Sequence, residues 1–319
     1  MKAVLIRQFG PPDVMKIEEV ENPRISADQA LVRVHYSSVN PVDWKIRNGS
    51  LRLLTGSKFP MRLGFDVAGE VIETGPSVTK FRKGDRVFGM LHYKQRGAYA
   101  EYACFDEDNI ATIPESLDFK EAAAVPLAAL TAYQALHYKG KIKSGEAVLV
   151  NGASGGVGSF AVQIGKAVGA SVTGVCGSGN RDLVRSLGAE KVMDYREQDF
   201  AESNERHDII FDAVGSRSFF AVRKSLKSSG RYITTLPNKS SDIISFFLTA
   251  LLPPFYDRKK STYINVRPSG SDLYGLSLLI KGEKVAPLID RAFTLEEIAD
   301  AHAYSETGHA RGKIVIKIS

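Results

Sequence analysis

Short runs in which apolar and polar residues alternate fill the first third of the chain. The run at residues 30–36 alternates with period two, as a half-buried strand does. Residues 67–72, 85–89 and 97–103 are further strand candidates, separated by Gly, Pro and Asp. We therefore expect a compact, largely antiparallel β domain up to residue 120.

The pattern changes after residue 120. Residues 121–138 are rich in Ala and Leu and predict a helix, with a kink or break at Pro126. Strand and helix patterns then alternate, which requires a parallel sheet with helices on both faces. The strand candidates are residues 147–151, 171–176, 191–194, 207–214, 231–236 and 262–266.

The last candidate strand, residues 313–318, is apolar and able to return to the first domain. We therefore predict an α/β protein with a β-rich first domain at 1–120, a second domain with a parallel sheet at 121–285, and a return to the first domain at 286–319. At 319 residues, two domains are the natural expectation.

A glycine-dense turn follows the strand at residues 147–151. Gly152, Gly155 and Gly158 are spaced three apart, Gly156 adds a further residue without a side chain, and a helical pattern follows. Residues without a Cβ let backbone N–H groups approach a diphosphate, and the positive end of the following helix favours its charge. Strand, turn and helix together predict dinucleotide binding.

The end of the next strand indicates which dinucleotide is bound. An NAD site places Asp or Glu about 20 residues after the glycines, whereas an NADP site uses small, polar and basic groups. Ser178 and Arg181 occupy this position, and the planar guanidinium of arginine suits a phosphate. This favours NADPH. The alternative is that Ser178 only caps the next helix and Arg181 is solvated.

Composition and charge exclude several classes of protein. Two distant cysteines favour a reducing compartment and offer no metal knuckle, and the opening apolar run is too short for a signal peptide, so we expect a cytoplasmic protein. The net charge of +6 is scattered without aromatic interleaving, so we expect no nucleic-acid partner. Residues 243–252 are too short to span a bilayer; core packing, a lid, a dimer contact and a membrane-surface patch remain open.

Seven motifs, in family order and covering essentially the whole chain, resemble the medium-chain dehydrogenase/reductase family, specifically its zinc-free quinone oxidoreductase branch. They lie at residues 38–43, 81–87, 130–133, 152–158, 187–189, 194–195 and 308–315. The resemblance implies a GroES-like β-rich catalytic domain and a Rossmann domain, with the active site in the cleft between them.

The same resemblance locates the positions where zinc-dependent members carry their ligands. Those members have a Cys within the segment 39–43 and a His-Glu pair after the glycine, whereas this chain has Asn40 and Phe65-Asp66. Residues 90–96 contain none of the cysteines of a structural zinc loop. Zinc needs three or four such ligands, so we expect no metal site.

Without a Lewis acid, conjugated acceptors suit the site better than alcohols. We expect hydride transfer from NADPH to quinones or α,β-unsaturated carbonyls, with donors to the developing oxyanion from Asn40, Lys45 and Arg47. Some family members have Tyr at the position of Lys45. A proton relay through that tyrosine is therefore not expected in this chain. In the alternative interpretation Asn40 closes a turn before Pro41 and Lys45 is exposed.

The resemblance also implies the cofactor contacts. Ser154, Gly155, Gly156 and Val157 are expected along the diphosphate, and Ser178 and Arg181 at the 2′-phosphate. Tyr195 is expected beside the adenosine, unless it only packs the sheet edge. Further candidate contacts are Thr131 at the nicotinamide, Val214, Leu236 and Val266 near strand ends, and Arg311 or Lys313 in the returning segment.

Partners and rival functions follow from the same reasoning. A small-molecule quinone or enone is the expected substrate, and the family suggests a homodimer in which the edge strand 262–266 pairs across a two-fold axis. One alternative is an enoyl-thioester reductase, with a basic channel for a phosphopantetheine carrier. The other is a non-catalytic NADPH-binding or RNA-binding protein.

Overall fold

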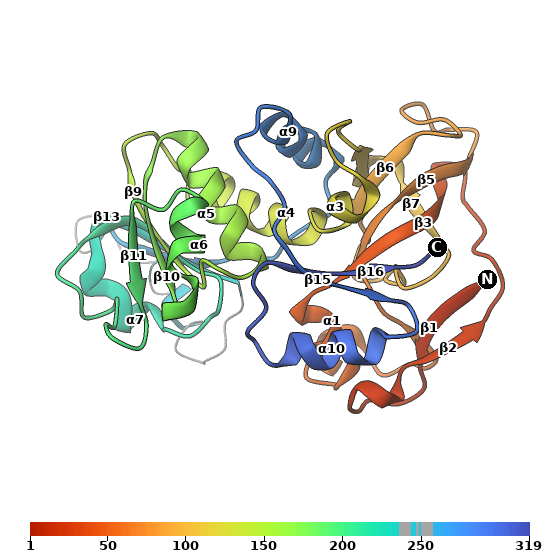
Figure 1. Cartoon of the computed structure of the whole chain (residues 1–319), viewed down its shortest axis with the longest axis horizontal. Helices are drawn as coiled ribbons and strands as arrows, with labels where there is room; N and C mark the ends of the chain where they lie inside the picture. Colours follow the sequence, from red (N-terminus) through yellow and green to blue (C-terminus); the bar gives the residue numbers. More distant parts are fainter. Residues whose placement is uncertain (236–243, 247–248, 250–257) are drawn as a thin grey trace. The chain divides into compact units, whose positions relative to one another are not determined.

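The computed structural model describes residues 1–235, 244–246, 249 and 258–319. The chain divides into two compact units (Figure 1). The first unit comprises Met1–Leu130, Arg267–Lys281 and Pro287–Ser319, and the second comprises Thr131–Val266 and Gly282–Ala286. Leu236 and most of the apolar segment 243–252 lie outside the described residues.

The first unit is built on two sheets. The larger has the order β15-β16-β3-β5-β6-β8, with β7 also pairing with β3, and the smaller has the order β2-β1-β4. Its strands are β1 (Lys2–Ile6), β2 (Lys16–Glu19), β3 (Gln29–Val39), β4 (Met61–Arg62), β5 (Asp66–Thr74), β6 (Arg86–Met90), β7 (Tyr102–Asp106), β8 (Ile110–Thr112), β15 (Ile289–Thr294) and β16 (Lys313–Lys317). Its helices are η1 (Pro12–Val14), α1 (Pro41–Arg47), α2 (Arg52–Thr55), η2 (Glu107–Asn109), α3 (Phe119–Ala123), α9 (Gly270–Lys281) and α10 (Ile298–Glu306).

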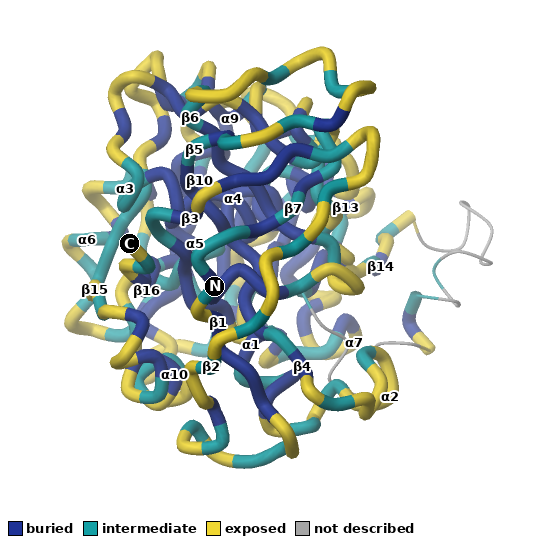
Figure 2. The backbone as a smooth tube through the Cα atoms, turned by 90° about the vertical axis from the view of Figure 1, so that its right-hand side faces the viewer, coloured by how far each residue is buried: buried dark blue, intermediate teal, exposed yellow. Residues whose placement is uncertain are grey.

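Alternation along β3 gives this unit its core. Val32 and Val34 are fully buried and pack with apolar residues of neighbouring strands, whereas Arg33 between them is exposed. Figure 2 colours the backbone by burial. Gly69 on β5 permits the close approach of β3, because a Cβ there would lie 2.0 Å from the Arg33 carbonyl oxygen. β16 pairs antiparallel with β3, so the predicted C-terminal strand does pair with the first domain.

The expected strand at 97–103 differs from the structure. β7 begins only at Tyr102, because the residues before it bond elsewhere: residues 97–99 donate to a loop, and residues 99–101 pair with β1 through an isolated bridge. The backbone N–H groups of Gly97 and Ala98 donate to the Gly64 carbonyl, and that of Tyr99 donates to Leu63. A period-two pattern does not distinguish these two pairings.

The second unit contains a six-stranded parallel sheet with the order β11-β10-β9-β12-β13-β14. The strands are β9 (Ala147–Asn151), β10 (Ser171–Cys176), β11 (Lys191–Asp194), β12 (His207–Asp212), β13 (Leu226–Thr234) and β14 (Lys260–Tyr263). Helices α5 (Gly156–Val168) and α6 (Arg181–Ser186) pack along the strands (Figure 1). Shorter helices are η3 (Ala135–Lys139), η4 (Ser178–Asn180), α7 (Phe219–Val222) and η5 (Arg223–Ser225). The strand order is that of a doubly wound dinucleotide-binding sheet, as expected.

The helix expected at 121–138 is divided at the position that Pro126 indicated. α3 ends at Ala123, α4 (Pro126–Gln134) begins at that proline, and a π-helical turn, η3, follows. Proline is suited to the first helical position because its missing N–H has no partner there in any case. α4 runs across the boundary between the two compact units.

Three expected strands end earlier in the structure, and one of them is β13, which stops at Thr234. β12 stops at Asp212, whose side chain accepts hydrogen bonds from the backbone of Val214 and Gly215 and so turns the chain. β14 stops at Tyr263, which places Val266 in the loop beyond it. Val214 and Val266 therefore lie after the strands.

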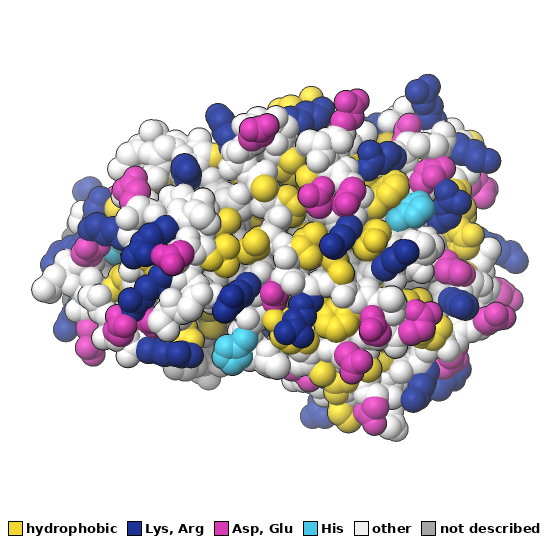
Figure 3. Space-filling model, viewed as in Figure 1, with side chains coloured by type: hydrophobic (Ala, Val, Ile, Leu, Met, Phe, Trp, Pro, Cys, Tyr) yellow, Lys and Arg dark blue, Asp and Glu magenta, His cyan; other side chains and the backbone are white. Residues whose placement is uncertain are grey.

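Surface charge is mixed. On the face in view in Figure 3, Lys and Arg side chains are interspersed with Asp and Glu. Within the part of the chain that the structure describes, no helix has the length and apolar character needed to cross a membrane.

Candidate functional site

The glycines in the turn after β9 differ in what the structure requires of them. Gly152 has φ +79°, a left-handed conformation that glycine adopts without strain. A Cβ on Gly158 would lie 2.0 Å from the Gly152 carbonyl oxygen, so α5 packs this closely only with glycine there. A Cβ on Gly155 meets nothing nearer than 3.4 Å, so packing within the chain leaves that position open.

The N-terminus of α5 has no side-chain cap. Gly155 precedes the helix as its N-cap residue, and the first turn contains no acidic side chain. The first N–H groups of a helix lack partners within it and carry a positive partial charge. The Gly155 N–H itself donates to the Gly152 carbonyl (3.0 Å), so Gly156 and Val157 present the donors. They lie beside a turn of small residues, which fits a diphosphate.

The sheet brings a second loop beside this turn. β9 and β12 are neighbours, and the strand order reverses at this point, where open α/β sheets bind ligands. The Asn151 amide donates to the Asp212 carboxylate (2.8 Å) and to the Ser216 hydroxyl (2.9 Å), which fixes the loop after β12. Val214 on that loop is 57% exposed and covers Gly152, because a Cβ there would lie 2.6 Å from Val214 Cγ2.

The expected adenosine contacts also gather at one edge of the sheet. The Asn180 amide donates to Ser154 Oγ (3.1 Å), which joins the end of β10 to the glycine turn. Ser178 opens η4 and is exposed. Tyr195 follows β11, is 52% exposed, and lies against Gly177. An exposed aromatic ring beside a backbone without a side chain offers a flat contact for a nucleoside.

Arg181 is already paired in the structure. Its guanidinium lies 3.1 Å from the carboxylate of Asp194, whose side chain is buried, and 2.5 Å from that of Glu197, which is 66% exposed. These partners raise the pKa of Arg181, Glu197 being the larger cause. Arg181 is therefore not simply solvated, as one sequence interpretation had it. In the other interpretation, a 2′-phosphate that binds Arg181 has to compete with the Glu197 carboxylate.

Sequence reasoning did not find Arg196, which lies at the same edge. Its guanidinium lies 5.7 Å from the centre of the Tyr195 ring, a cation–π distance, and its side chain is exposed. Its place directly after a candidate cofactor tyrosine was the available signal.

The remaining cofactor candidates are dispersed. Thr131 is buried in α4, Val266 is half-buried, and the Arg311 side chain is exposed while its backbone N–H donates to Asp290. Leu236 lies outside the described residues. The structure groups Ser154, Gly155, Gly156, Val157, Ser178, Arg181, Tyr195 and Val214 around the ends of β9 to β12.

The catalytic candidates lie in the first unit beside a buried carboxylate, Asp66. One oxygen of this carboxylate accepts from Ser38 Oγ (2.5 Å) and Asn40 Nδ2 (2.8 Å) and lies 3.3 Å from Lys313 Nζ. Its other oxygen accepts from the backbone N–H of Leu127 (2.7 Å). Buried charges are normally paired and hydrogen-bonded in this way.

Both ends of the Asn40 amide are engaged in this cluster. Its Oδ1 accepts from Lys313 Nζ, and its Nδ2 donates to Asp66. Asn40 is 2% exposed and also forms the N-cap of α1 before Pro41. One N–H of the amide remains for a ligand. Burial lowers the pKa of Lys313, although the Asp66 charge opposes that effect.

Lys45 and Arg47 occupy different environments on α1. Lys45 is half-buried, burial lowers its pKa, and its ammonium lies 5.5 Å from the Trp44 ring centre. Arg47 is 1% exposed and pairs with Glu306 of α10. Arg47 therefore ties two helices together, whereas Lys45 keeps an ammonium without an ion pair among the described residues.

A second polar chain runs behind this cluster. Asp43 accepts from the Asn40 backbone N–H, and complete burial raises its pKa to about 7. The Tyr99 hydroxyl lies 3.3 Å from His302 Nε2, and burial lowers the pKa of His302 to about 3. Sequence reasoning did not join these residues, because 203 positions separate Tyr99 from His302.

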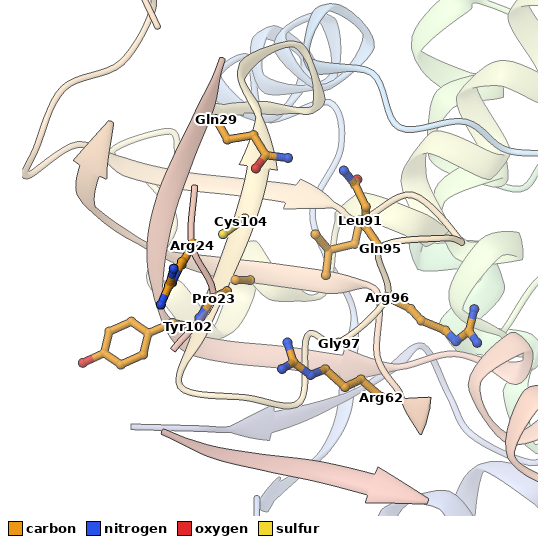
Figure 4. A pocket seen from close by; sticks show the side chains of 11 residues that line it. Pro23, Arg24, Gln29, Arg62, Leu91, Gln95, Arg96, Gly97, Tyr102 and Cys104 are labelled. Atoms are coloured by element: carbon orange, nitrogen blue, oxygen red, sulfur yellow. The ribbon is translucent and has the colours of Figure 1, made fainter. Parts of the chain in front are cut away.

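A separate pocket in the first unit has a different lining (Figure 4). Arg24, Arg62 and Arg96 contribute to it together with Cys104. Burial raises the pKa of the Cys104 thiol to about 11, which makes this cysteine a poor nucleophile at neutral pH. None of the catalytic or cofactor candidates lines this pocket.

Metal ligands do not gather at any of these places. Among residues 1–235, 244–246, 249 and 258–319, no three His, Cys, Asp or Glu side chains lie close enough to hold a metal ion. The expected absence of zinc stays a prediction about the protein in solution.

Two family models match the chain. An alcohol dehydrogenase GroES-like domain matches residues 26–115, and a zinc-binding dehydrogenase domain matches residues 187–316. The first covers the β-rich part that holds Asn40 and Asp66, and the second begins within the parallel sheet.

Individual relatives match the whole chain. A quinone-oxidoreductase homolog from spinach chloroplasts is 35% identical over 97% of this chain and 95% of its own length. An NADPH-dependent alkenal/one oxidoreductase from Arabidopsis thaliana is 34% identical over 99% of this chain and 79% of its own length.

The solved structures agree. The quinone oxidoreductase of Coxiella burnetii superposes with a TM-score of 0.89 at 33% identity, covering 100% of this chain and 99% of that one. The chain belongs to the medium-chain dehydrogenase/reductase family, in its quinone oxidoreductase-like branch.

Proposed function

We propose that this chain is an NADPH-dependent oxidoreductase that transfers hydride to quinones or α,β-unsaturated carbonyls. The observation that carries the proposal is the uncapped N-terminus of α5 behind the Gly152–Gly158 turn. It lies at the reversal point of a doubly wound sheet, where a dinucleotide diphosphate binds. Relatives named for quinone and for alkenal/one reduction support both acceptor classes.

The end of β10 supports the phosphorylated cofactor. The residues directly after β10 include no carboxylate to bind a ribose 2′-hydroxyl; Ser178, Asn180 and Arg181 follow the strand. The Arg196 guanidinium lies 5.7 Å from the centre of the Tyr195 ring. Hydroxyl, amide and guanidinium groups suit a 2′-phosphate. The name of the Arabidopsis relative includes NADPH dependence.

When bound, the reduced nicotinamide supplies the hydride. The protein orients the acceptor and stabilises the negative charge that develops on its oxygen. We assign the charge-stabilising role to the Asn40 amide hydrogen that is not bonded to Asp66, and to the Lys45 ammonium. Lys313 and Asp66 hold the Asn40 amide in one orientation.

Reduction without zinc belongs to the same proposal. The positions of the zinc ligands in metal-dependent relatives are occupied here by Asn40 and by Phe65-Asp66. The Asp66 carboxylate is turned toward Ser38, Asn40, Leu127 and Lys313, whose hydrogen bonds occupy both of its oxygens. A lysine ammonium at this carboxylate disfavours a metal cation in the same place.

Location and assembly are the last part of the proposal. Cys104 and Cys176 are both free, which favours the cytoplasm or another reducing compartment. A homodimer through β14 is consistent with its position as the edge strand of the six-stranded sheet.

The experiment that tests this function follows the hydride itself. NADPH carrying deuterium at C4 of the nicotinamide is mixed with a 2-alkenal, and the product is analysed by mass spectrometry. We expect deuterium at the β-carbon of the saturated aldehyde. Deuterium at the carbonyl carbon of an alcohol would assign the chain to alcohol dehydrogenase chemistry instead.

Substitution of Lys45 tests the donor assignment in the same assay. Lys45→Met is expected to lower kcat by roughly a hundredfold, the scale of a lost transition-state donor, while NADPH affinity is unchanged. Lys83→Met, at an exposed lysine of the same unit, is the control and should leave kcat unchanged.

A further inference from the structure

Two leucines of α2 project into solvent beside each other. Leu53 is 95% exposed and Leu54 is 73% exposed. The turn that carries them is ordered by hydrogen bonds: the backbone N–H of Gly56 donates to Arg52, and Thr55 Oγ1 donates to the Leu51 carbonyl. Leaving two adjacent leucines in water costs the free energy that their burial elsewhere would have contributed, so their place on a fixed turn calls for an apolar partner.

The charged residues of the α2 segment and of the segment bonded to it all have one sign. Residues 48–60 and 90–98 contain Arg52, Lys58, Lys94 and Arg96 and no Asp or Glu. Arg96 joins the two segments, because it donates to the backbone carbonyls of Tyr93 (2.9 Å) and Thr55 (3.5 Å). We call the exposed residues of these segments the α2 surface: Arg52, Leu53, Leu54, Lys58, Tyr93 and Lys94.

Tyr93 adds an amphipathic ring to this surface. It is 45% exposed, and the Lys94 ammonium lies 5.9 Å from its ring centre. Tyrosine and lysine are favoured where an apolar phase meets water, since each has an apolar body and a polar end.

The arginine-lined pocket of Figure 4 adjoins this surface through Arg96. The Arg96 side chain points away from those of Arg24 and Arg62, toward its bond with Thr55 (Figure 4). None of the residues that line the pocket is acidic, and in the described part of the chain neither Arg24 nor Arg62 forms an ion pair. Two acids outside this lining, Glu73 and Asp106, act on Cys104, and Asp106 also accepts a hydrogen bond from Gln29.

We propose that the α2 surface docks this protein on an anionic lipid bilayer. Leu53 and Leu54 enter the boundary between headgroups and acyl chains, and the surrounding cations lie at the level of the lipid phosphates. The observations favour a bilayer over a protein partner because both leucines protrude, at 95% and 73% exposed. Two bonded segments that contain cations and no carboxylates match a uniformly anionic sheet better than the mixed charges of a protein surface.

Docking in this way has a consequence that rests on the proposed function. A quinone with a long apolar tail resides in the bilayer, so a reductase held at its surface meets that acceptor without extracting it into water. Binding to vesicles requires neither an acceptor nor turnover, so the docking surface and the reductase activity fail or succeed separately.

Vesicle sedimentation tests the proposal. The full chain is mixed with vesicles of phosphatidylcholine alone, or of phosphatidylcholine with phosphatidylglycerol, at low and high salt. We expect sedimentation with the anionic vesicles only, decreasing as salt rises. Sedimentation with neither vesicle type at low salt overturns the proposal.

Two pairs of variants separate the apolar from the electrostatic contribution. Leu53→Ser/Leu54→Ser is expected to weaken vesicle binding roughly tenfold or more, whereas Leu278→Ser, at a half-exposed leucine of α9, has no effect. Arg52→Glu/Lys58→Glu is expected to weaken binding by a similar factor or more, whereas Lys16→Glu/Lys83→Glu, with the same change of net charge, binds far better. If each variant and its control lost vesicle binding equally, net charge or general hydrophobicity would explain the binding. That result would overturn the assignment of the α2 surface.

Turnover of a short, water-soluble alkenal completes the test. In Leu53→Ser/Leu54→Ser it is expected to be unchanged, as are NADPH binding and the thermal unfolding midpoint. A loss of this turnover in a folded variant would place the leucines in the acceptor site and overturn the docking surface. Sedimentation with a second protein but not with vesicles would do the same.

Discussion

The guanidinium of Arg181 bridges two carboxylates of unequal freedom, that of Asp194 at 3.1 Å and that of Glu197 at 2.5 Å. The Asp194 side chain is 1% exposed and also accepts from the Arg196 backbone N–H, so it is fixed. The Glu197 side chain is 66% exposed and free to turn into solvent. Asp194 therefore orients Arg181, and Glu197 occupies a side of the guanidinium that the proposed contact with a ribose 2′-phosphate would need.

Removal of Arg181 is expected to change the preference for cofactor. Arg181→Ala should weaken NADPH binding by roughly tenfold or more, the scale of a charge-assisted hydrogen bond, and leave NADH binding nearly unchanged. Arg185→Ala, at an exposed arginine of the same helix paired with Asp182, is the matched control. Fluorescence titration measures both constants. Equal losses for NADPH and NADH would remove Arg181 from the 2′-phosphate site.

Removal of the competing carboxylate should act in the opposite direction. Glu197→Gln is expected to strengthen NADPH binding by roughly threefold, since an exposed ion pair contributes about 1 kcal/mol at most. Glu202→Gln removes an exposed carboxylate nearby without touching Arg181 and serves as the control. Weaker NADPH binding by the Glu197 variant would mean that this carboxylate supports the site.

Substitutions at two glycines of the turn test packing and ligand contact separately. Gly158→Ala places a Cβ 2.0 Å from the Gly152 carbonyl oxygen, so it should lower the thermal midpoint and abolish binding of both nucleotides. Gly155→Ala has φ −82° and no internal contact nearer than 3.4 Å, so it should fold normally and still bind NADPH more weakly. Calorimetry and titration distinguish the two. Wild-type affinity in Gly155→Ala would contradict the diphosphate assignment.

His302 is expected to make stability depend on pH. Burial lowers its pKa from 6.5 to about 3 in the folded chain, so between these values the unfolded chain binds a proton that the folded chain does not. The free energy of unfolding should therefore fall as pH decreases, by about 2 kcal/mol at a pH of about 5. Urea unfolding of His302→Gln should lack this part of the decrease, whereas exposed His309→Gln should keep it. Identical slopes in all three proteins would refute the prediction.

Asp43 contributes a slope of the opposite sign. Burial raises its pKa from 3.8 to about 7, so between these values the folded chain holds a proton that the unfolded chain has released. Stability from this group is present at low pH and is lost as pH rises toward 7. The His302→Gln variant retains Asp43, so its free energy of unfolding should decrease as pH rises across this range.

Much of the second unit could be predicted from sequence because its signals are local. The turn at Gly152–Gly158 and the alternation of strands and helices each reflect neighbouring residues, and the sheet order follows from them. Strand ends were less accurate: Asp212 turns the chain through its own side chain, two residues before the expected end of the strand.

The cluster in the first unit could not be predicted from sequence in the same way. Lys313 and Asn40 are 273 positions apart, and only the pairing of β16 with β3 brings them together. The two carboxylate partners of Arg181 likewise depend on β11 lying beside β10. Local patterns carry no information about such contacts, which arise from tertiary packing.

The measurement that tests the central claim most directly is the rate of nucleotide oxidation with two acceptors. NADPH and NADH are each supplied with an ortho-quinone and with a short 2-alkenal, before and after dialysis against a metal chelator. Hydride transfer as proposed predicts turnover of at least one acceptor, roughly tenfold or more faster with NADPH at limiting nucleotide, and unchanged by chelation. Bound NADPH without turnover of either acceptor, or activity lost on chelation and restored by zinc, would contradict it.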